Sequence, residues 1–182
     1  ILVDGVDTKE MTRHELRDRF GMVLQDAWLF EGSIRDNIAY AQDNLPEEKI
    51  IAAGRSASVD SFIKTLPGGY DFELSTGAEN ISQGQRQLLT IARAMASDPE
   101  IMILDEATSN VDTHTEQLIQ KALAKLMHGR TSFVIAHRLS TIRDADMILY
   151  MEHGDILEHG SHEELMAQHG KYEALYMSQF AQ

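Results

Sequence analysis

Short apolar runs alternate with amphipathic segments along the first part of the chain. Residues 1–3 (ILV) end at an Asp-Gly turn, and residues 21–25 (GMVLQ) form a second apolar run, so we expect a strand at each. Between the two runs, residues 12–15 (TRHE) have the form of a capping box. The sequence therefore predicts a short helix that begins after Thr12 and separates two strands.

Residues from about 34 to 96 carry a helical pattern. Ser33 is placed to cap a short helix, and Pro46 suits the first position of a helix that runs to about residue 56. The Pro-Gly-Gly sequence at 67–69 indicates a turn. Ser82, with Gln85 three positions later, then predicts the start of a longer helix that ends near residue 96.

After residue 100 the pattern changes to strand, helix, strand. Residues 101–104 are wholly apolar, residues 118–127 carry apolar side chains at helical spacing, and residues 132–136 form another apolar run. Apolar strands joined by an amphipathic helix are typical of a parallel crossover unit. Residues 147–151 and 155–158 then predict a hairpin, and the capping box at 161–164 predicts a terminal helical stretch.

These elements predict an α/β fold in two interleaved parts. We expect residues 1–30 and 97–182 to form a core with parallel strands, and residues 31–96 to form a mainly helical insertion.

Composition narrows the possible functions. The net charge of −13 disfavours broad, non-specific binding to nucleic acid, and the absence of cysteine excludes both a disulfide scaffold and a thiolate zinc site. The longest apolar runs are far shorter than the roughly 20 residues that a membrane-spanning helix needs. Four histidines at 153, 159, 162 and 169 match no zinc-binding spacing.

Candidate chemistry lies where the predicted strands end. Asp105 and Glu106 follow the apolar strand at 101–104, and His137 follows the strand at 132–136. The carboxyl ends of parallel strands are where open α/β sheets bind ligands, so we expect these side chains to share a crevice. One carboxylate there would hold Mg²⁺ and the other would orient a water molecule, whereas two solvated acids at a strand end are the simpler alternative.

The predicted helix start at Ser82 is a second candidate. Gly84 lets the backbone approach a ligand without a Cβ in the way, and the first turn of a helix favours anions. A capping box that only begins a helix explains the same residues equally well.

Taken together, three motifs resemble the nucleotide-binding domain of ABC transporters. They are ISQGQRQLL at 81–89, ILDEATS at 103–109 and AHRL at 136–139, and the resemblance runs in order over the whole chain. It implies a partial RecA-like core of the P-loop NTPase class with parallel strands, into which a helical signature subdomain is inserted. It further implies an exporter-type ATPase that uses Mg²⁺ with ATP.

The resemblance assigns a role to each motif residue. Asp105 resembles the Walker B aspartate that serves Mg²⁺, Glu106 the carboxylate for the attacking water, and His137 the switch histidine at the γ-phosphate. The other matches are Gln25 (Q-loop, reaching the metal), Ser82, Gly84 and Gln85 (signature, acting in trans on ATP held by the partner), and Asp112 (D-loop). Glu79, in the TGAE stretch, and the apolar Trp28-Leu29-Phe30 would face the transmembrane part, although core packing explains the apolar cluster equally well.

Two departures from the family pattern stand out. Gln83 replaces the first glycine of the commonest signature, a change that we expect function to survive. No G-x-x-x-x-G-K-[ST] phosphate loop occurs in the 182 residues, and we expect Ile1 to fall just after the helix that follows this loop in the family. We therefore expect this chain to be part of a longer protein and to be inactive by itself.

The function expected from the resemblance is ATP hydrolysis that powers export across a membrane. The partners would be ATP, a second nucleotide-binding domain, identical or different, and a transmembrane domain, with no nucleic acid. The location would be the cytoplasmic face of the membrane. The alternative is a soluble ABC-type ATPase that acts on ribosomes or DNA, for which basic patches would be expected.

Overall fold

A computed structural model describes residues 1–40, 42, 44–105, 111–136 and 139–180. The chain divides into two compact units, residues 1–134 and 135–182. No helix in the described part of the chain is both long enough and apolar enough to span a membrane.

The first unit begins with an antiparallel pair of short strands, β1 (Leu2–Val3) and β2 (Val6–Asp7). Helix α1 (Arg13–Asp18) follows, and Thr12 caps it through a complete capping box, as the sequence predicts. The Thr12 Oγ1 accepts the Glu15 N–H at 3.2 Å, and the Glu15 carboxylate accepts the Thr12 N–H at 2.8 Å. These local bonds satisfy backbone groups that the helix start leaves without partners inside the helix.

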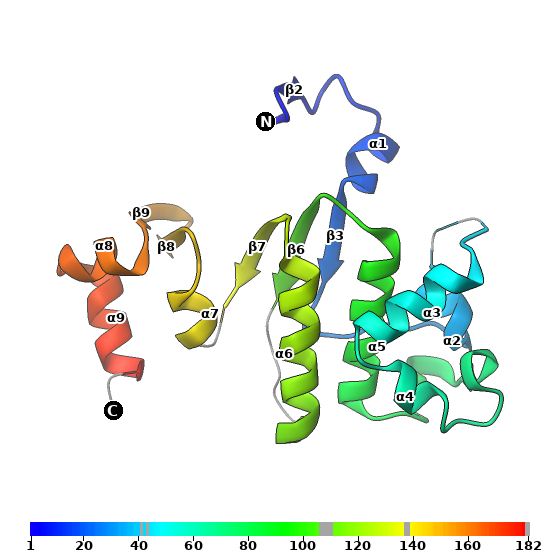
Figure 1. Ribbon diagram of the computed structural model, residues 1–182. Coiled ribbons are helices and arrows are strands. Elements are labelled where there is room, and N and C mark those ends of the chain that lie inside the picture. The colour runs from blue at the N-terminus through cyan, green and yellow to red at the C-terminus, as the bar shows by residue number, and fades with distance from the viewer. Residues whose placement is uncertain (41, 43, 106–110, 137–138, 181–182) are drawn as a thin grey trace. The chain divides into compact units, whose positions relative to one another are not determined.

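A three-stranded sheet in the order β3-β6-β7 forms the centre of this unit. Strand β3 (Phe20–Val23) runs parallel to β6 (Ile101–Asp105), with Gly21 paired to Met102 and Val23 to Leu104. Figure 1 shows the arrow of β7 (Thr131–Ile135) pointing the same way as those of β3 and β6. Helix α6 (Thr113–Met127) connects β6 to β7, so the predicted parallel crossover is confirmed.

The two faces of the sheet differ in burial. On one face Val23, Met102 and Leu104 are buried and belong to the same apolar core as residues of α5 (Gln83–Ser97) and α6. On the other face Met22, Leu24 and Phe133 are each at least half exposed. One side of the sheet therefore carries the core of this unit, because alternate residues of a strand point to opposite faces.

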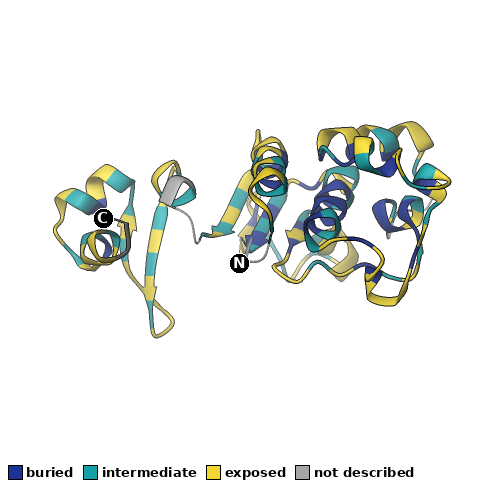
Figure 2. Cartoon of the chain, turned by 90° about the horizontal axis from the view of Figure 1, so that it is seen from below, coloured by how far each residue is buried: buried dark blue, intermediate teal, exposed yellow. Residues whose placement is uncertain are grey.

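The region between β3 and β6 is mainly helical and surrounds α5. Its helices are α2 (Ile34–Ile38), α3 (Glu47–Ser56), α4 (Asp60–Ile63) and the short 3₁₀ turns η1 (Gly69–Asp71) and η2 (Thr76–Ala78). Two short strands that the sequence did not predict, β4 (Gly32–Ser33) and β5 (Glu73–Leu74), pair antiparallel. Buried positions, dark blue in Figure 2, occur on α2, α3 and α4 and are most numerous on α5.

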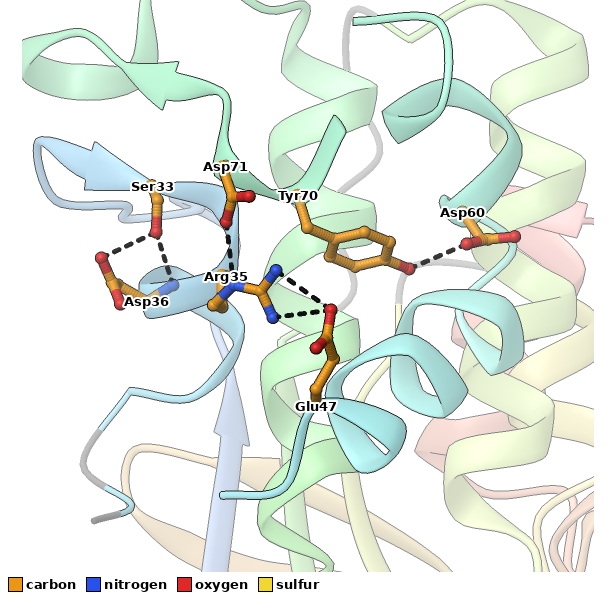
Figure 3. A network of polar contacts seen from close by, with 7 residues as sticks. All are labelled: Ser33, Arg35, Asp36, Glu47, Asp60, Tyr70 and Asp71. Atoms are coloured by element: carbon orange, nitrogen blue, oxygen red, sulfur yellow. Dashed lines mark hydrogen bonds and ion pairs between the residues drawn. The ribbon is translucent and has the colours of Figure 1, made fainter. Parts of the chain in front are cut away.

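A polar network fixes the short elements of this region to one another (Figure 3). Arg35 on α2 donates from Nε to Asp71 Oδ1 at 2.9 Å and from Nη2 to Glu47 Oε1 at 3.2 Å, which joins α2 to η1 and α3. Tyr70 donates its hydroxyl to Asp60 Oδ1 at 3.0 Å and thereby joins η1 to α4. Four elements that are too short to be stable alone are connected in this way.

The second unit contains α7 (Leu139–Arg143), the antiparallel hairpin β8 (Ile148–Glu152) and β9 (Asp155–Gly160), and helices α8 (His162–Ala167) and α9 (Lys171–Phe180). The hairpin and the capping box at Ser161 are as the sequence predicts. Glu158 on β9 caps α9, since its carboxylate accepts the N–H groups of Lys171 at 2.7 Å and Tyr172 at 3.0 Å.

Candidate functional site: the carboxyl edge of the parallel sheet

The parallel register of β3 and β6 places Gln25 and Asp105 at one edge of the sheet. Val23 is paired with Leu104, Asp105 is the last residue of β6, and Gln25 lies two residues beyond the end of β3. Strand β7 ends at the same edge, as its arrow in Figure 1 shows. This edge is the place where open α/β sheets bind ligands.

Two of the predicted catalytic residues, Glu106 and His137, lie outside the described residues. Glu106 follows Asp105 directly, and His137 comes two residues after the end of β7. Their sequence positions follow the ends of neighbouring strands, and their roles stay predictions.

The donor groups at this edge suit magnesium. Asp105 offers carboxylate oxygens and Gln25 an amide oxygen, and oxygen ligands are what Mg²⁺ prefers. Within the described part of the chain, no three His, Cys, Asp or Glu side chains are grouped closely enough to form a metal site of their own. A Mg²⁺ that arrives with a nucleotide needs only one or two protein ligands, so this donor set fits the ion.

The predicted signature segment forms the start of α5. Ser82 is its N-cap, and its Oγ accepts the Gln85 N–H at 3.3 Å, while Gln85 Oε1 accepts the Ser82 N–H at 2.8 Å. The capping box is therefore present as expected. It satisfies two backbone N–H groups of the helix start within the chain itself.

Gly84 is buried against the start of α6. A Cβ built at this glycine would lie 3.1 Å from Val111 Cγ1 and would overlap the Cγ2 methyl of Thr115. The sequence suggests that Gly84 admits a ligand close to the backbone. The structure adds a second reason for glycine at this position, which is the close approach of two helices.

Asp112, the predicted D-loop residue, is the N-cap of α6. Its Oδ1 accepts the Thr115 N–H at 3.0 Å. The bond from the Thr115 backbone, followed by the bond from the Thr115 side chain, holds the pKa of this carboxyl below its usual value. Asp112 is exposed and stays ionised at neutral pH, so it keeps both its charge and its capping role.

A cavity of about 390 Å³ lies beside the segment that follows Gln25. It is lined by residues 25–29, by Gly77 and Glu79, and by Gln83 and Arg86 in the first turns of α5. Arg86 donates from Nη1 to the carbonyl oxygens of Ala78 at 3.1 Å and Ile81 at 3.2 Å, which holds the 77–81 segment against α5. The cavity thus brings together Gln25, Trp28 and Glu79, three residues that the sequence singles out separately.

Two residues that the sequence analysis did not single out, Asn37 and Arg93, organise the segment after Gln25. Asn37 is fully buried, accepts the Phe30 N–H at 3.1 Å and donates to the carbonyl oxygens of Phe30 and Ser33, each at 3.0 Å. Arg93 on α5 donates to Asn37 O at 2.8 Å, Asn37 Oδ1 at 3.0 Å and Trp28 O at 3.1 Å. An arginine within the stretch 88–96, which is apolar apart from Thr90, was the available signal.

Arg93 also lies over two aromatic rings. Its guanidinium carbon is 4.8 Å from the ring centre of Tyr40 and 5.8 Å from that of Trp28, distances at which a cation attracts an aromatic face. Burial lowers the pKa of Arg93, yet an arginine remains charged at any physiological pH. The cation and its carbonyl partners therefore join the segment after Gln25 to the helix that begins at Ser82.

Comparison with known proteins agrees with this arrangement. The family model described as "ABC transporter" matches residues 1–109. An uncharacterized ABC transporter ATP-binding protein, YfiC, of Bacillus subtilis is 53% identical over 99% of the chain, and a fatty acid ABC transporter ATP-binding/permease protein of Mycobacterium bovis is 54% identical over 94%. A bacterial Atm1-family ABC exporter, solved with ATP bound, matches the whole chain with a TM-score of 0.88 and 40% identity.

The chain spans about 30% of the length of these proteins, at 30%, 27% and 32% respectively. The likeness to the exporter structure confirms the predicted α/β fold class with parallel strands. Because the family model covers more than half of the chain, this chain belongs to the ABC transporter family.

Proposed function

We propose that this chain is part of the ATP-binding and ATP-hydrolysing domain of an exporter-type ABC transporter. The observation that carries the proposal is the placement of Gln25 and Asp105 at one edge of a parallel sheet. The names of the relatives support it, since one is an ATP-binding/permease protein and another an exporter. ATP hydrolysis, the transmembrane partner and a site at the cytoplasmic face of the membrane are proposed for the complete protein.

In this proposal each of four residues has one task. Asp105 and Gln25 would hold Mg²⁺, which would neutralise negative charge on the phosphates of ATP. Glu106 orients the attacking water and accepts its proton, and His137 donates a hydrogen bond to a γ-phosphate oxygen. Positioning and electrostatic stabilisation supply most of the catalysis in phosphoryl transfer, so a rigid sheet edge suits the reaction.

The start of α5 acts on a second domain. Ser82, Gly84 and Gln85 would contact ATP held by the partner, and Asp112 would lie at the seam between the two domains. A head-to-tail pair, of identical or different chains, then forms two composite sites. ATP binding closes the pair and hydrolysis reopens it, because only the closed state contacts the triphosphate from both sides.

The cavity beside Gln25 is the proposed contact with the transmembrane part. Trp28, which is 59% exposed, and the acidic Glu79 both line it. Only a few residues separate Gln25 from Trp28, so a movement of Gln25 at the sheet edge would be transmitted to this surface. We also propose the division into a core of residues 1–30 and 97–182 and an inserted helical subdomain of residues 31–96.

Phosphate release by the complete protein tests this function. Purified in lipid nanodiscs, the protein should release phosphate from ATP with Mg²⁺ present and stop when EDTA removes the ion. An Asp105→Asn variant should need more Mg²⁺ for half-maximal rate, because it loses a charged ligand. A protein that is correctly folded and yet releases no phosphate, with any lipid or transport substrate tried, contradicts the proposal.

The alternative, an ATPase that acts on ribosomes or DNA, gains no support. The net charge of −13 opposes the long-range attraction that such polyanionic partners need. The relative that is named for a function, a fatty acid ABC transporter, and the exporter structure both point to transport.

A further inference from the structure

The starts of α5 and α6 lie in direct contact. Ser82 caps α5 and Asp112 caps α6. Gly84, in the first turn of α5, is buried against Val111 and Thr115, which flank the cap of α6 on either side. Any side chain at Gly84 would push the two helix starts apart, since a Cβ there overlaps Thr115.

Thr115 makes different contacts on its two sides. Its backbone N–H donates to Asp112 Oδ1 at 3.0 Å. Its Cγ2 methyl lies against Gly84. Because threonine is branched at Cβ and restricted to two χ1 rotamers in a helix, the methyl has little freedom to turn away from Gly84. The position of Gly84 is thereby tied to that of Asp112.

We infer that Thr115 is a positioning residue, which fixes the Ser82 end of α5 against the Asp112 cap of α6 so that the two helix starts move as one body. The inference rests on the proposed function, in which Ser82 and Asp112 both lie at the seam between two nucleotide-binding domains. On this inference, residue 84 must be glycine because it packs against α6 of the same chain, in addition to any contact that it makes with nucleotide.

A rescue experiment in the complete protein tests this contact. Gly84→Ala should lower kcat for ATP by roughly 10- to 100-fold, because a shift of about 1 Å in a positioning element costs that much. Thr115→Ser removes the methyl and keeps the hydroxyl, so the double variant Gly84→Ala/Thr115→Ser should have a kcat about fivefold or more above that of Gly84→Ala alone. Thr115→Val is the matched control, since it keeps the bulk and removes only the hydroxyl. Gly84→Ala/Thr115→Val should stay low.

Three results would overturn the inference: full activity of Gly84→Ala, no recovery with serine, or equal recovery with valine. The second is the result expected if Gly84 serves only the approach of nucleotide. If Gly84→Ala does not fold at the assay temperature, melting temperatures give the same test. Serine at residue 115 should raise the melting temperature of Gly84→Ala, and valine should not. Because the melts need no ATP turnover, a wild-type protein that does not hydrolyse ATP would refute the proposed function and still leave this contact tested.

Discussion

The guanidinium of Arg93 donates a hydrogen bond to the carbonyl oxygen of Trp28 at 3.1 Å, across 65 residues of sequence. Trp28 lies three residues after Gln25, and Arg93 lies on the helix that begins at Ser82. The candidate metal-binding residue and the candidate signature residue are therefore connected through one helix. Asn37 completes this connection, because it binds both Arg93 and the backbone of Phe30.

The first prediction concerns Asn37. Asn37→Ala should lower the free energy of unfolding by about 3 kcal/mol, because it leaves buried backbone groups and the Arg93 guanidinium without partners. Asn80→Ala is the matched control: Asn80 also bonds the backbone, accepting from Ser75 N and donating to Glu73 O, but it is exposed to water. Urea denaturation should show a loss below about 1 kcal/mol for Asn80→Ala. Equal losses for the two variants would contradict the assigned role of Asn37.

The second prediction concerns Tyr70 and alkaline pH. Burial, then the hydrogen bond to Asp60, raises the pKa of Tyr70 well above its usual value of 10. Above about pH 10 the unfolded chain loses this proton while the folded protein keeps it, so stability falls as pH rises. At pH 8 the free energy of unfolding of the wild-type protein should exceed that of Tyr70→Phe by about 1 kcal/mol. This difference should shrink at pH 10.5. A constant difference in urea titrations at the two pH values would refute this.

The third prediction concerns Gly21 on β3. A Cβ there would lie 2.5 Å from Pro99 Cγ and 2.7 Å from Met102 Sδ. Gly21→Ala should cost about 1–3 kcal/mol of stability and should also lower ATP turnover, because it forces β3 away from β6 and displaces Gln25 from Asp105. Adding Pro99→Ala, which removes the Cγ, should restore part of both losses. If the double variant recovered stability but no ATP turnover, the proposed effect of the β3–β6 spacing on the site would be contradicted.

The fourth prediction concerns the second unit. Glu158→Ala removes the carboxylate that caps α9 and should raise amide hydrogen exchange at residues 171–176 about fivefold, equivalent to roughly 1 kcal/mol. Glu163→Ala, in the exposed first turn of α8, is the control and should leave α9 unchanged. If exchange in α9 responded to both variants alike, Glu158 would not be a specific cap.

Local signals in the sequence predicted much of this fold. The caps at Thr12, Ser33, Ser82 and Ser161 are confirmed, because each depends on bonds that span only three residues. Pro46 shows the usual error at a boundary: it precedes α3 as its N-cap, whereas the sequence predicted the first helical position.

Features that depend on distant partners were not predictable. The strands β4 and β5 are two residues each and pair across about forty residues, so neither carries a visible alternation of apolar and polar positions. The Asn37–Arg93 contact joins residues 56 apart, and the overlap of Gly84 with Thr115 depends on how two helices pack. In the candidate site, the shared edge of Gln25 and Asp105 follows from parallel strands, whereas the roles of Glu106 and His137 stay predictions.

Steady-state ATP hydrolysis by two variants of the complete protein tests the central claim most directly. Glu106→Gln and Glu100→Gln make the same change just beyond opposite ends of β6, and Glu100 is a largely exposed residue that pairs with Arg19 at 2.9 Å. Glu106→Gln should lower kcat by about 100- to 10,000-fold, as loss of a general base does, and Glu100→Gln should stay within about threefold of wild type. Near-normal turnover in Glu106→Gln, or equal losses in both variants, would contradict the account.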